Sequence, residues 1–259
     1  SAILDNLKKY NSEKAKIFVF GVGFDVNIQF LDKIATQQHG DSGYVRPEEN
    51  IESTVSGIFT KINMPVLTNL KIDYSNVEVT DTFPKELPDL FKGSQLLVFG
   101  RYRDGGSANI KITGEVARHK KTFEFPVNFS KSENTDYLPR LWATRKIGYL
   151  LDEIRLKGKN QEMVDEVIKL SKKYGIITEF TSFLVQEDTD ISKPVPAYRE
   201  EVNKKLDTAQ DADKGSWAIS QSRNASKLKN QANQAPNSYY NNEGKTVNLE
   251  QQVQNMGNK

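Results

Sequence analysis

Two glycines close the apolar segment IFVFGVG, in the order Gly21-Val22-Gly23. A glycine-rich turn between a strand and a helix can cradle the phosphates of a dinucleotide, because it lets the backbone approach the ligand closely. That chemistry needs a third glycine at the position of Val26, and the acidic residue near the ribose-binding distance, Asp41, lies in a HGDSG turn. The pattern therefore favours a structural explanation for this strand over a nucleotide site.

Groups that could perform catalysis or bind a metal are sparse in this chain. The two histidines, His39 and His119, fall at a predicted helix end and in a predicted hairpin turn. A histidine near a helix C-terminus interacts favourably with the helix dipole, which explains His39 without a ligand. Cysteine is absent, which excludes disulfides and thiolate chemistry. We predict no catalytic, cofactor-binding or metal-binding residue here, and no enzymatic activity.

Two pairs of adjacent acids, Asp152-Glu153 and Asp165-Glu166, could be proposed as a glycosidase-like pair of carboxylates. Neighbouring residues on a helix do not face each other. Charged positions opposite an apolar stripe are usually solvated. We therefore expect these four carboxylates to lie in solvent.

The segment RLWATRK places Arg140, Arg145 and Lys146 beside Trp142, a basic and aromatic combination that could bind a nucleic acid. We predict instead that Trp142 is buried where a helix meets the β-layer, and that Arg140 and Arg145 pair with acidic groups there. The net charge of +2 gives no reason to expect nucleic acid or an anionic membrane as the main partner. No apolar run approaches the roughly 18–20 residues that span a bilayer.

Two further segments have a binding interpretation and a simpler structural one. YGIITEFTSF could be an exposed strand that accepts a peptide, but a packed internal strand is favoured. Tyr239 and Tyr240 could form a short docking motif, although a solvated linker explains them equally well.

The elements that would position these groups begin with an α/β pattern in residues 1–64. The apolar run before Gly23 predicts a parallel strand buried on both faces. A helix then begins after Asn27, its N-cap, and ends near Gly40. A short strand, GYVRP, precedes a second helix, in which the following residues are expected to face inward: Ile51, Val55, Ile58, Phe59 and Ile62. This order predicts the end of a doubly wound α/β domain.

Three further regions follow. Residues 65–130 alternate with period two through LTNLKIDYS, VEVTDTF, QLLVFGRYR, ANIKITGEVA and KTFEFPVNF, with a turn at Arg118-His119-Lys120, which predicts an antiparallel β-sandwich layer. Residues 131–187 predict a helical hairpin with a closing strand. Residues 188–259 are charged and rich in Asn and Gln, so we expect a low-complexity linker or disordered tail with at most transient helices.

In order along the chain, these segments resemble a known family. KIFVFGVGFDVNIQFLDKIATQQHGDSGYVRPEENIESTVSGIFTKINMPVLTNLKI resembles the last third of a von Willebrand factor A-type domain. LPRLWATRKIGYLLDEIRLKGKNQEMVDEVIKLSKKYGIITEFTSFLVQE resembles the tail of the inter-alpha-trypsin-inhibitor heavy-chain family and its bacterial relatives, and is the more specific match. In that family the A-type domain follows an N-terminal (VIT) β-sandwich domain. The resemblance covers roughly residues 1–187.

The resemblance implies that IFVFGVG is a late strand of the A-type sheet, with GFDVN as its exit turn. A-type domains often bind Mg²⁺ through Asp-x-Ser-x-Ser, a motif that is absent here, so the site is expected upstream of Ser1 in a longer protein. Vertebrate members are secreted and can be linked to glycosaminoglycan at an Asp-Pro-His signature, which is also absent. The cysteine-free chain and Asn/Gln-rich end look more like a bacterial relative.

The resulting expectation is a non-catalytic protein-interaction or adhesion protein, extracellular or in the cell envelope, with a protein or extracellular-matrix-type ligand. The chain itself should contain no cofactor, although Mg²⁺ could bind the full-length protein. The alternative is a purely structural region that braces the sandwich and the A-type domain. If the β-layer borrows upstream strands, the chain by itself would expose sheet edges, and we expect poor solubility or self-association.

Overall fold

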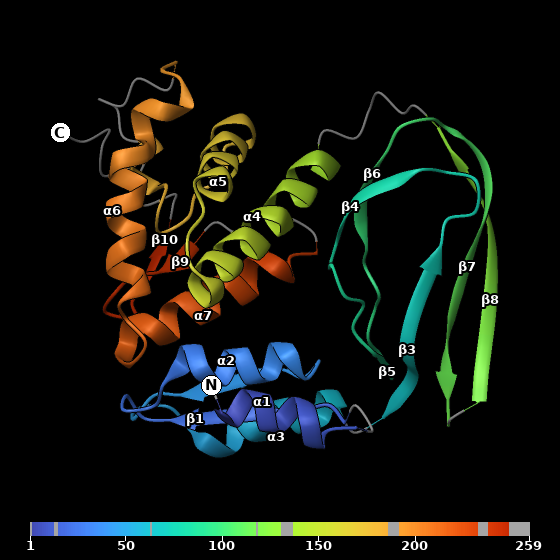
Figure 1. Ribbon diagram of the computed structural model, residues 1–259, viewed down its shortest axis with the longest axis horizontal. Coiled ribbons are helices and arrows are strands. Elements are labelled where there is room, and N and C mark those ends of the chain that lie inside the picture. Colours follow the sequence, from blue (N-terminus) through green and yellow to red (C-terminus); the bar gives the residue numbers. More distant parts are fainter. Residues whose placement is uncertain are drawn as a thin grey trace.

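The computed structural model describes residues 2–12, 15–62, 64–117, 119–130, 137–185, 192–232 and 238–248. Figure 1 shows three parts: an N-terminal α/β layer at the lower left, a group of long helices above it, and a β-layer at the right. The chain passes from the α/β layer into the β-layer and then returns through the helices, so α7 lies beside α2.

From β1 onward, the α/β layer has the element order that the sequence predicts. It consists of α1 (Ala2–Tyr10), β1 (Val19–Val22), α2 (Ile28–Gln37), β2 (Ser42–Val45) and α3 (Ile51–Ile62). β1 and β2 are parallel, with Val19 opposite Ser42. The predicted N-cap is confirmed, because the Asn27 side chain accepts a hydrogen bond from the Phe30 backbone N–H at 2.8 Å.

The burial predicted for this layer is wrong in two places. Phe20 and Val22 of β1 are 38% and 52% exposed, so the strand is not buried on both faces. Of the predicted inward-facing residues of α3, Ile58 is buried, whereas Ile51, Val55 and Phe59 are exposed and the side chain of Ile62 lies outside the described residues. The described sheet here has two strands, which is too narrow to cover either surface.

The β-layer is antiparallel, and all five predicted strands are present. Its elements are β3 (Pro65–Asp73), β4 (Val79–Phe83), β5 (Leu90–Phe91), β6 (Phe99–Tyr102), β7 (Gly106–Val116) and β8 (His119–Phe129). One sheet has the order β5-β3-β7-β8, and β4 pairs separately with β6. The predicted turn is shifted, because β8 already begins at His119. That residue is therefore in a strand, opposite Val116. Closure into a sandwich stays a prediction.

The predicted helical hairpin is confirmed as α4 (Tyr137–Lys157) and α5 (Gln161–Tyr174). Asn160 caps α5 by accepting from the Glu162 N–H at 2.7 Å. Gly175 ends α5 in the left-handed conformation, with φ at 60°, which costs glycine little because it has no Cβ.

The closing strand expected from IITEFTSF is wrong. The segment is a buried turn followed by the 3₁₀ helix η1 (Ser182–Val185). Thr178 Oγ1 and Thr181 Oγ1 lie 3.0 Å apart, and the Thr178 N–H donates to Thr181 Oγ1 at 3.1 Å. These side chains satisfy the local backbone in a turn, which competes with the extended conformation.

The linker expected after residue 187 is also wrong for much of its length. It contains η2 (Val195–Tyr198), α6 (Arg199–Gln210), α7 (Gly215–Lys229) and the hairpin β9 (Ser238–Tyr240) to β10 (Thr246–Asn248). Val202 and Ile219 are fully buried. Small and polar side chains of α7 pack against other helices, so a composition average underestimates the burial available there. The last residues, 249–259, lie outside the described part, and the boundaries at 64, 130 and 187 stay predictions.

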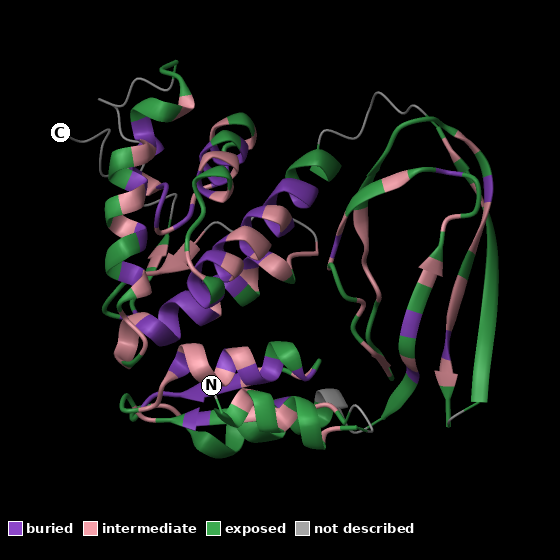
Figure 2. Cartoon of the chain, viewed as in Figure 1, coloured by how far each residue is buried: buried purple, intermediate pink, exposed green. Residues whose placement is uncertain are grey.

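The main core surrounds α4, along which Figure 2 shows a nearly continuous buried stripe. Phe83 of β4 joins the β-layer to this core, with its ring 6.4 Å from Trp142 and 5.7 Å from Tyr149. A second, smaller core links the α/β layer to α7 through Ile28, Tyr44 and Ile219.

Candidate functional site

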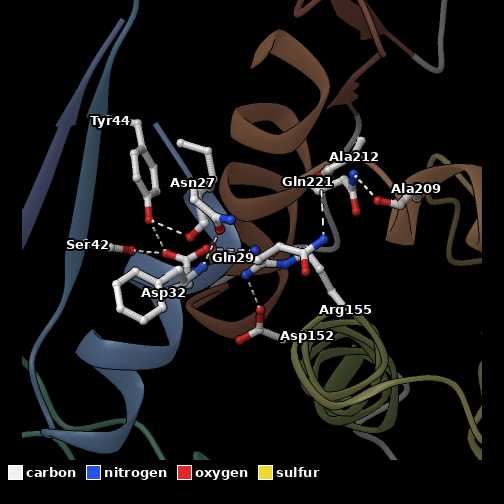
Figure 3. Close-up of polar contacts among 12 residues, drawn as sticks. Asn27, Gln29, Asp32, Ser42, Tyr44, Asp152, Arg155, Ala209, Ala212 and Gln221 are labelled. Atoms are coloured by element: carbon white, nitrogen blue, oxygen red, sulfur yellow. Dashed lines mark hydrogen bonds and ion pairs between the residues drawn. The ribbon is translucent and has the colours of Figure 1, made fainter. Parts of the chain in front are cut away.

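A buried group of charges lies where α2, α4 and α7 meet, and Figure 3 shows Arg155 at its centre. Arg155 Nη1 of α4 is 2.7 Å from Asp32 Oδ2 of α2. Arg155 Nη2 donates to Asp152 Oδ1 at 2.6 Å, and Lys229 Nζ of α7 donates to Asp152 Oδ2 at 2.5 Å. These four charges therefore connect the N-terminal layer to both helices.

Asp32 also accepts two hydrogen bonds from β2. Its Oδ1 atom receives the hydroxyl of Ser42 at 2.5 Å and that of Tyr44 at 2.6 Å. Burial, together with the nearby Asp32 charge, holds the pKa of Tyr44 far above its ordinary value. Tyr44 is therefore a hydrogen-bond donor at physiological pH and not a general base.

The expectation that Asp152 is solvated is wrong, since it is only 7% exposed. Burial opposes ionisation of Asp152, but the charges of Lys229 and Arg155 outweigh that effect and lower its pKa. The neighbouring acid Glu153 bonds Lys157 at 2.6 Å instead. On α5, Asp165 is bound by Arg199 and Glu166 by Lys146. Neither pair of adjacent acids converges on a common point.

A second ionic group attaches the β9–β10 hairpin to the α/β layer. Arg223 of α7 binds Glu49 through both terminal nitrogens, at 2.8 and 2.6 Å, and this lowers the pKa of Glu49 to about 2. Arg46 Nη1 donates to the Gly244 carbonyl at 2.8 Å. Asn224 donates to the Tyr240 carbonyl at 2.9 Å and accepts from its N–H at 2.8 Å. Tyr240 is thus a structural residue and not part of a solvated linker.

An open polar cleft of about 440 Å³ lies between these two groups. Asp32 and Ser42 line one wall, and Arg223 and Lys227 of α7 line the other. Lys227 Nζ donates to Ser238 at 2.8 Å and 2.7 Å, and burial lowers its pKa. Asp32, Asp152, Arg155 and Lys229 of the cleft bind within their own group, while Arg223 and Lys227 bind Glu49 and Ser238, so these side chains hold elements together.

One carboxyl group near the first group of charges, that of Glu179, differs from the others in its hydrogen bonding. Glu179 lies in the turn after α5, and burial raises its pKa to about 7, with smaller opposing contributions from a hydrogen bond with Asn224 and the charge of Arg155. Within the described part of the chain, its Oε2 atom has no hydrogen-bond partner. Glu179 therefore keeps its proton to a higher pH than an ordinary carboxyl group does.

The glycine turn after β1 has a structural explanation at each glycine. A Cβ on Gly21 would lie 2.8 Å from the Tyr44 ring, and Gly23 has φ at +82°. The first donors of α2 already have partners, since the Ile28 N–H donates to the Asp213 carbonyl at 2.8 Å and the Phe30 N–H to Asn27. Val26 packs against the smaller core, and the Asp41 side chain accepts from the Ser42 N–H at 2.9 Å.

The burial predicted for Trp142 is confirmed, since it is 5% exposed and donates to the Asp81 carbonyl at 2.9 Å. The partners predicted for the arginines are wrong. Arg145 donates to the carbonyls of Leu97 and Gln231, and Arg140 to that of Gly175. It is Lys146 that pairs with acids, at 3.3 Å from Asp81 and 3.0 Å from Glu166.

The two histidines lie apart from these groups. His39 Nδ1 is 2.7 Å from Glu86 Oε2 on the surface, and His119 is exposed at the start of β8. Among the described residues, no three histidine or acidic side chains are grouped closely enough to hold a metal ion. None of the described helices is long and apolar enough to cross a membrane.

Curated proteins of one kind match most of this chain. The chain is similar to inter-alpha-trypsin inhibitor heavy chains. It is 27% identical to heavy chain H3 of Mus musculus over 201 residues, and 23% identical to heavy chain H2 of Sus scrofa and of Homo sapiens. Each match covers 73% of this chain but only 21–23% of the relative, so the chain spans about a fifth of their length. No family model matches the chain.

Sequence reasoning missed Arg155, Lys229, Arg223 and Glu179. One signal was available for the first of these, because Arg155 follows Asp152 by three residues and so shares a helix face with it. Nothing in the local pattern around Glu179 distinguishes it from an exposed acid. Its position depends on how α7 packs over the turn after α5.

Proposed function

We propose that this chain is part of a non-catalytic protein-interaction or adhesion protein of the heavy-chain type. The observation that carries the proposal is the similarity to inter-alpha-trypsin inhibitor heavy chains along 73% of the chain. The buried charges support it, because Arg155 binds both Asp32 and Asp152, and these groups present no paired acid and base to a substrate.

The ligand site of the whole protein is proposed to lie upstream of Ser1, in the preceding part of a von Willebrand A-type domain. That site would bind Mg²⁺ through carboxylate and hydroxyl oxygens, the ligands such a hard cation prefers. The ligand would be a protein or an extracellular-matrix-type molecule, and the protein would act in the extracellular space or the cell envelope. The absence of cysteine favours a bacterial source.

A second function, structural bracing, is favoured by a different observation. Arg155 and Lys229 tie α2, α4 and α7 together, and Phe83 anchors the β-layer to the same core. A region with these contacts would hold the A-type domain and the β-layer at a fixed angle without contacting a ligand.

A comparison of two proteins tests both proposals. The parent protein and this chain are each applied to immobilised collagen, fibronectin and hyaluronan, in Mg²⁺ and in EDTA. Binding by the parent alone, lost in EDTA, supports the upstream metal-dependent site. Binding by this chain in EDTA would contradict that site and assign the ligand to the residues described here. If neither protein binds, the bracing function is the better account.

A separate measurement on the parent protein tests the bracing function. Small-angle X-ray scattering of the parent and of its Arg155→Met variant compares the angle between its layers. Bracing predicts a broader distribution of shapes for the variant, whereas Lys157→Ala, which removes only a surface pair, should leave the scattering unchanged. Identical scattering from all three proteins would remove the support for bracing.

A further inference from the structure

β8 is the outermost strand of its sheet. Among the described strands, the sheet order β5-β3-β7-β8 gives it one neighbour, and Figure 1 shows it at the far edge of the molecule. It pairs with β7 along its whole length, and residues 119–126 are all exposed, as the continuous exposed colour of Figure 2 shows. A long, regular edge strand is a template for pairing with another strand.

The two faces of β8 differ in character. Phe123 and Phe125 lie on the same face as their β7 partners Ile112 and Ile110, yet they are 45% and 48% exposed. The opposite face carries Glu124, which bonds Asn109 at 2.7 Å and lies 3.5 Å from Lys111. Among the described residues, nothing covers the apolar face of this strand, which lies beside a polar one.

The backbone of β8 presents its free groups at alternate residues. Val116 and His119 face each other across the turn of the hairpin, so we assign them as a hydrogen-bonded pair. Odd-numbered residues of β8 then bond β7, and Lys120, Thr122 and Glu124 direct their N–H and C=O groups outward. Pro126 has no N–H, so the free edge lacks a hydrogen-bond donor at that position.

We propose that this edge pairs antiparallel with β8 of a second copy of the chain, centred on Thr122. In that register Thr122 faces its own copy, and Lys120 faces Glu124 of the other chain on both sides of the two-fold axis. Opposite charges placed directly across two strands stabilise the pairing. The free donors and acceptors of these three residues also face each other, as an isologous dimer requires.

Registers centred on the two adjacent even-numbered residues are worse. Centring on Lys120 would place two lysines together, and centring on Glu124 would place two glutamates together and bring Pro126 into the ladder. Like charges directly opposite one another are destabilising. In the Thr122 register, Phe123 lies directly opposite Lys121 and diagonal to Phe123 of the other copy, a distance that aromatic side chains can reach.

A charge exchange tests this register. Sedimentation equilibrium of the full chain should show a monomer–dimer equilibrium. Lys120→Glu and Glu124→Lys should each weaken dimerisation by roughly tenfold or more, because each creates two like-charge contacts. The double variant restores opposite charges and should regain dimerisation near that of the original chain. A monomer at all concentrations, or a double variant no better than the single ones, would overturn the proposal.

A cysteine variant tests the two-fold position directly, since the chain has no cysteine of its own. Thr122→Cys should oxidise to a covalent dimer, because directly opposed strand residues lie at a Cα separation compatible with a disulfide. Lys71→Cys is the matched control, on an exposed position of β3 in the same sheet. Equal crosslinking of both variants would show that the contact is not specific to β8. Absence of crosslinking in both would show that Thr122 does not face its own copy.

Discussion

The helical layer and the β-layer differ in which side chains they bury. Around α4, even charged residues are buried, and Asp152 binds two cations from different helices. On β8, aromatic residues that belong to the apolar face of the sheet are about half exposed. Polarity alone therefore does not determine which side chains of this chain are buried. Burial follows the number of helices and strands packed around each position.

The core of the helical layer is completed by helices from the C-terminal third of the chain. α7 lies across α4 so closely that a Cβ on Gly148 would meet Leu228 Cβ at 2.6 Å. The β-layer contacts this core through Phe83, which packs against Trp142, and its far edge is uncovered among the residues described. Changes in the helical layer should therefore affect folding, and changes on β8 should affect association.

The largest effect is expected from Arg155→Met. It leaves Asp32 without its cation and Asp152 with only Lys229, and removing one member of a buried ionic group costs about 3–5 kcal/mol. Urea unfolding followed by circular dichroism measures the change in free energy of unfolding. Lys157→Ala, which removes an exposed partner of Glu153, should cost less than about 1 kcal/mol. Equal losses in the two variants would contradict the buried network.

Glu179 should make stability fall as the pH rises. Its pKa in the folded chain is about 7, above the ordinary value of 4.5. Between these values the folded state keeps a proton that the unfolded state has lost, so the free energy of unfolding decreases with pH, by up to about 3 kcal/mol in total. Below pH 4.5 this residue contributes no slope.

Unfolding measured across pH 4 to 8 for the original chain and for Glu179→Gln checks this. The variant cannot ionise at that position and should lack this part of the slope. The difference between the two proteins should therefore grow with pH up to about 7. A difference that is constant across the range would show that Glu179 does not titrate with a raised pKa.

Gly148→Ala tests the packing of α7 on α4 through the sign of its effect. If α7 is in place, the added methyl group overlaps Leu228 and costs about 1–3 kcal/mol. If residues after 187 were a linker, alanine would stabilise the helix by about 1 kcal/mol. Gly57→Ala on α3 is the matched control, because nothing lies within 4 Å of its added Cβ and a stabilising effect is expected. Thermal unfolding distinguishes the two signs.

The smallest effect is expected on β8. Phe125→Ala should change the stability of the monomer by less than about 1 kcal/mol, because the side chain is 48% exposed. Phe83→Ala, within the same β-layer but only 3% exposed, should cost about 3–5 kcal/mol. Chemical unfolding at high dilution measures both. A large loss for Phe125→Ala would mean that the apolar face of β8 is covered.

Local features of the fold could be predicted from the sequence. The caps Asn27 and Asn160, the stop at Gly175 and the period-two strands all depend on interactions within a few residues. The candidate site could not be predicted in this way. Tyr240 and Lys229 are polar residues in a polar segment, and their burial depends on partners distant in the chain.

The sequence was enough to predict most of the helices and strands up to the end of α5 at Tyr174, together with the similarity to inter-alpha-trypsin inhibitor heavy chains. The tertiary structure alone decided that Asp152 is buried, that IITEFTSF turns, and that α6 and α7 complete the core. The reason is that hydrogen bonds and periodicity act locally. By contrast, desolvation depends on every element that packs nearby, and Lys229 reaches Asp152 across 77 residues of chain.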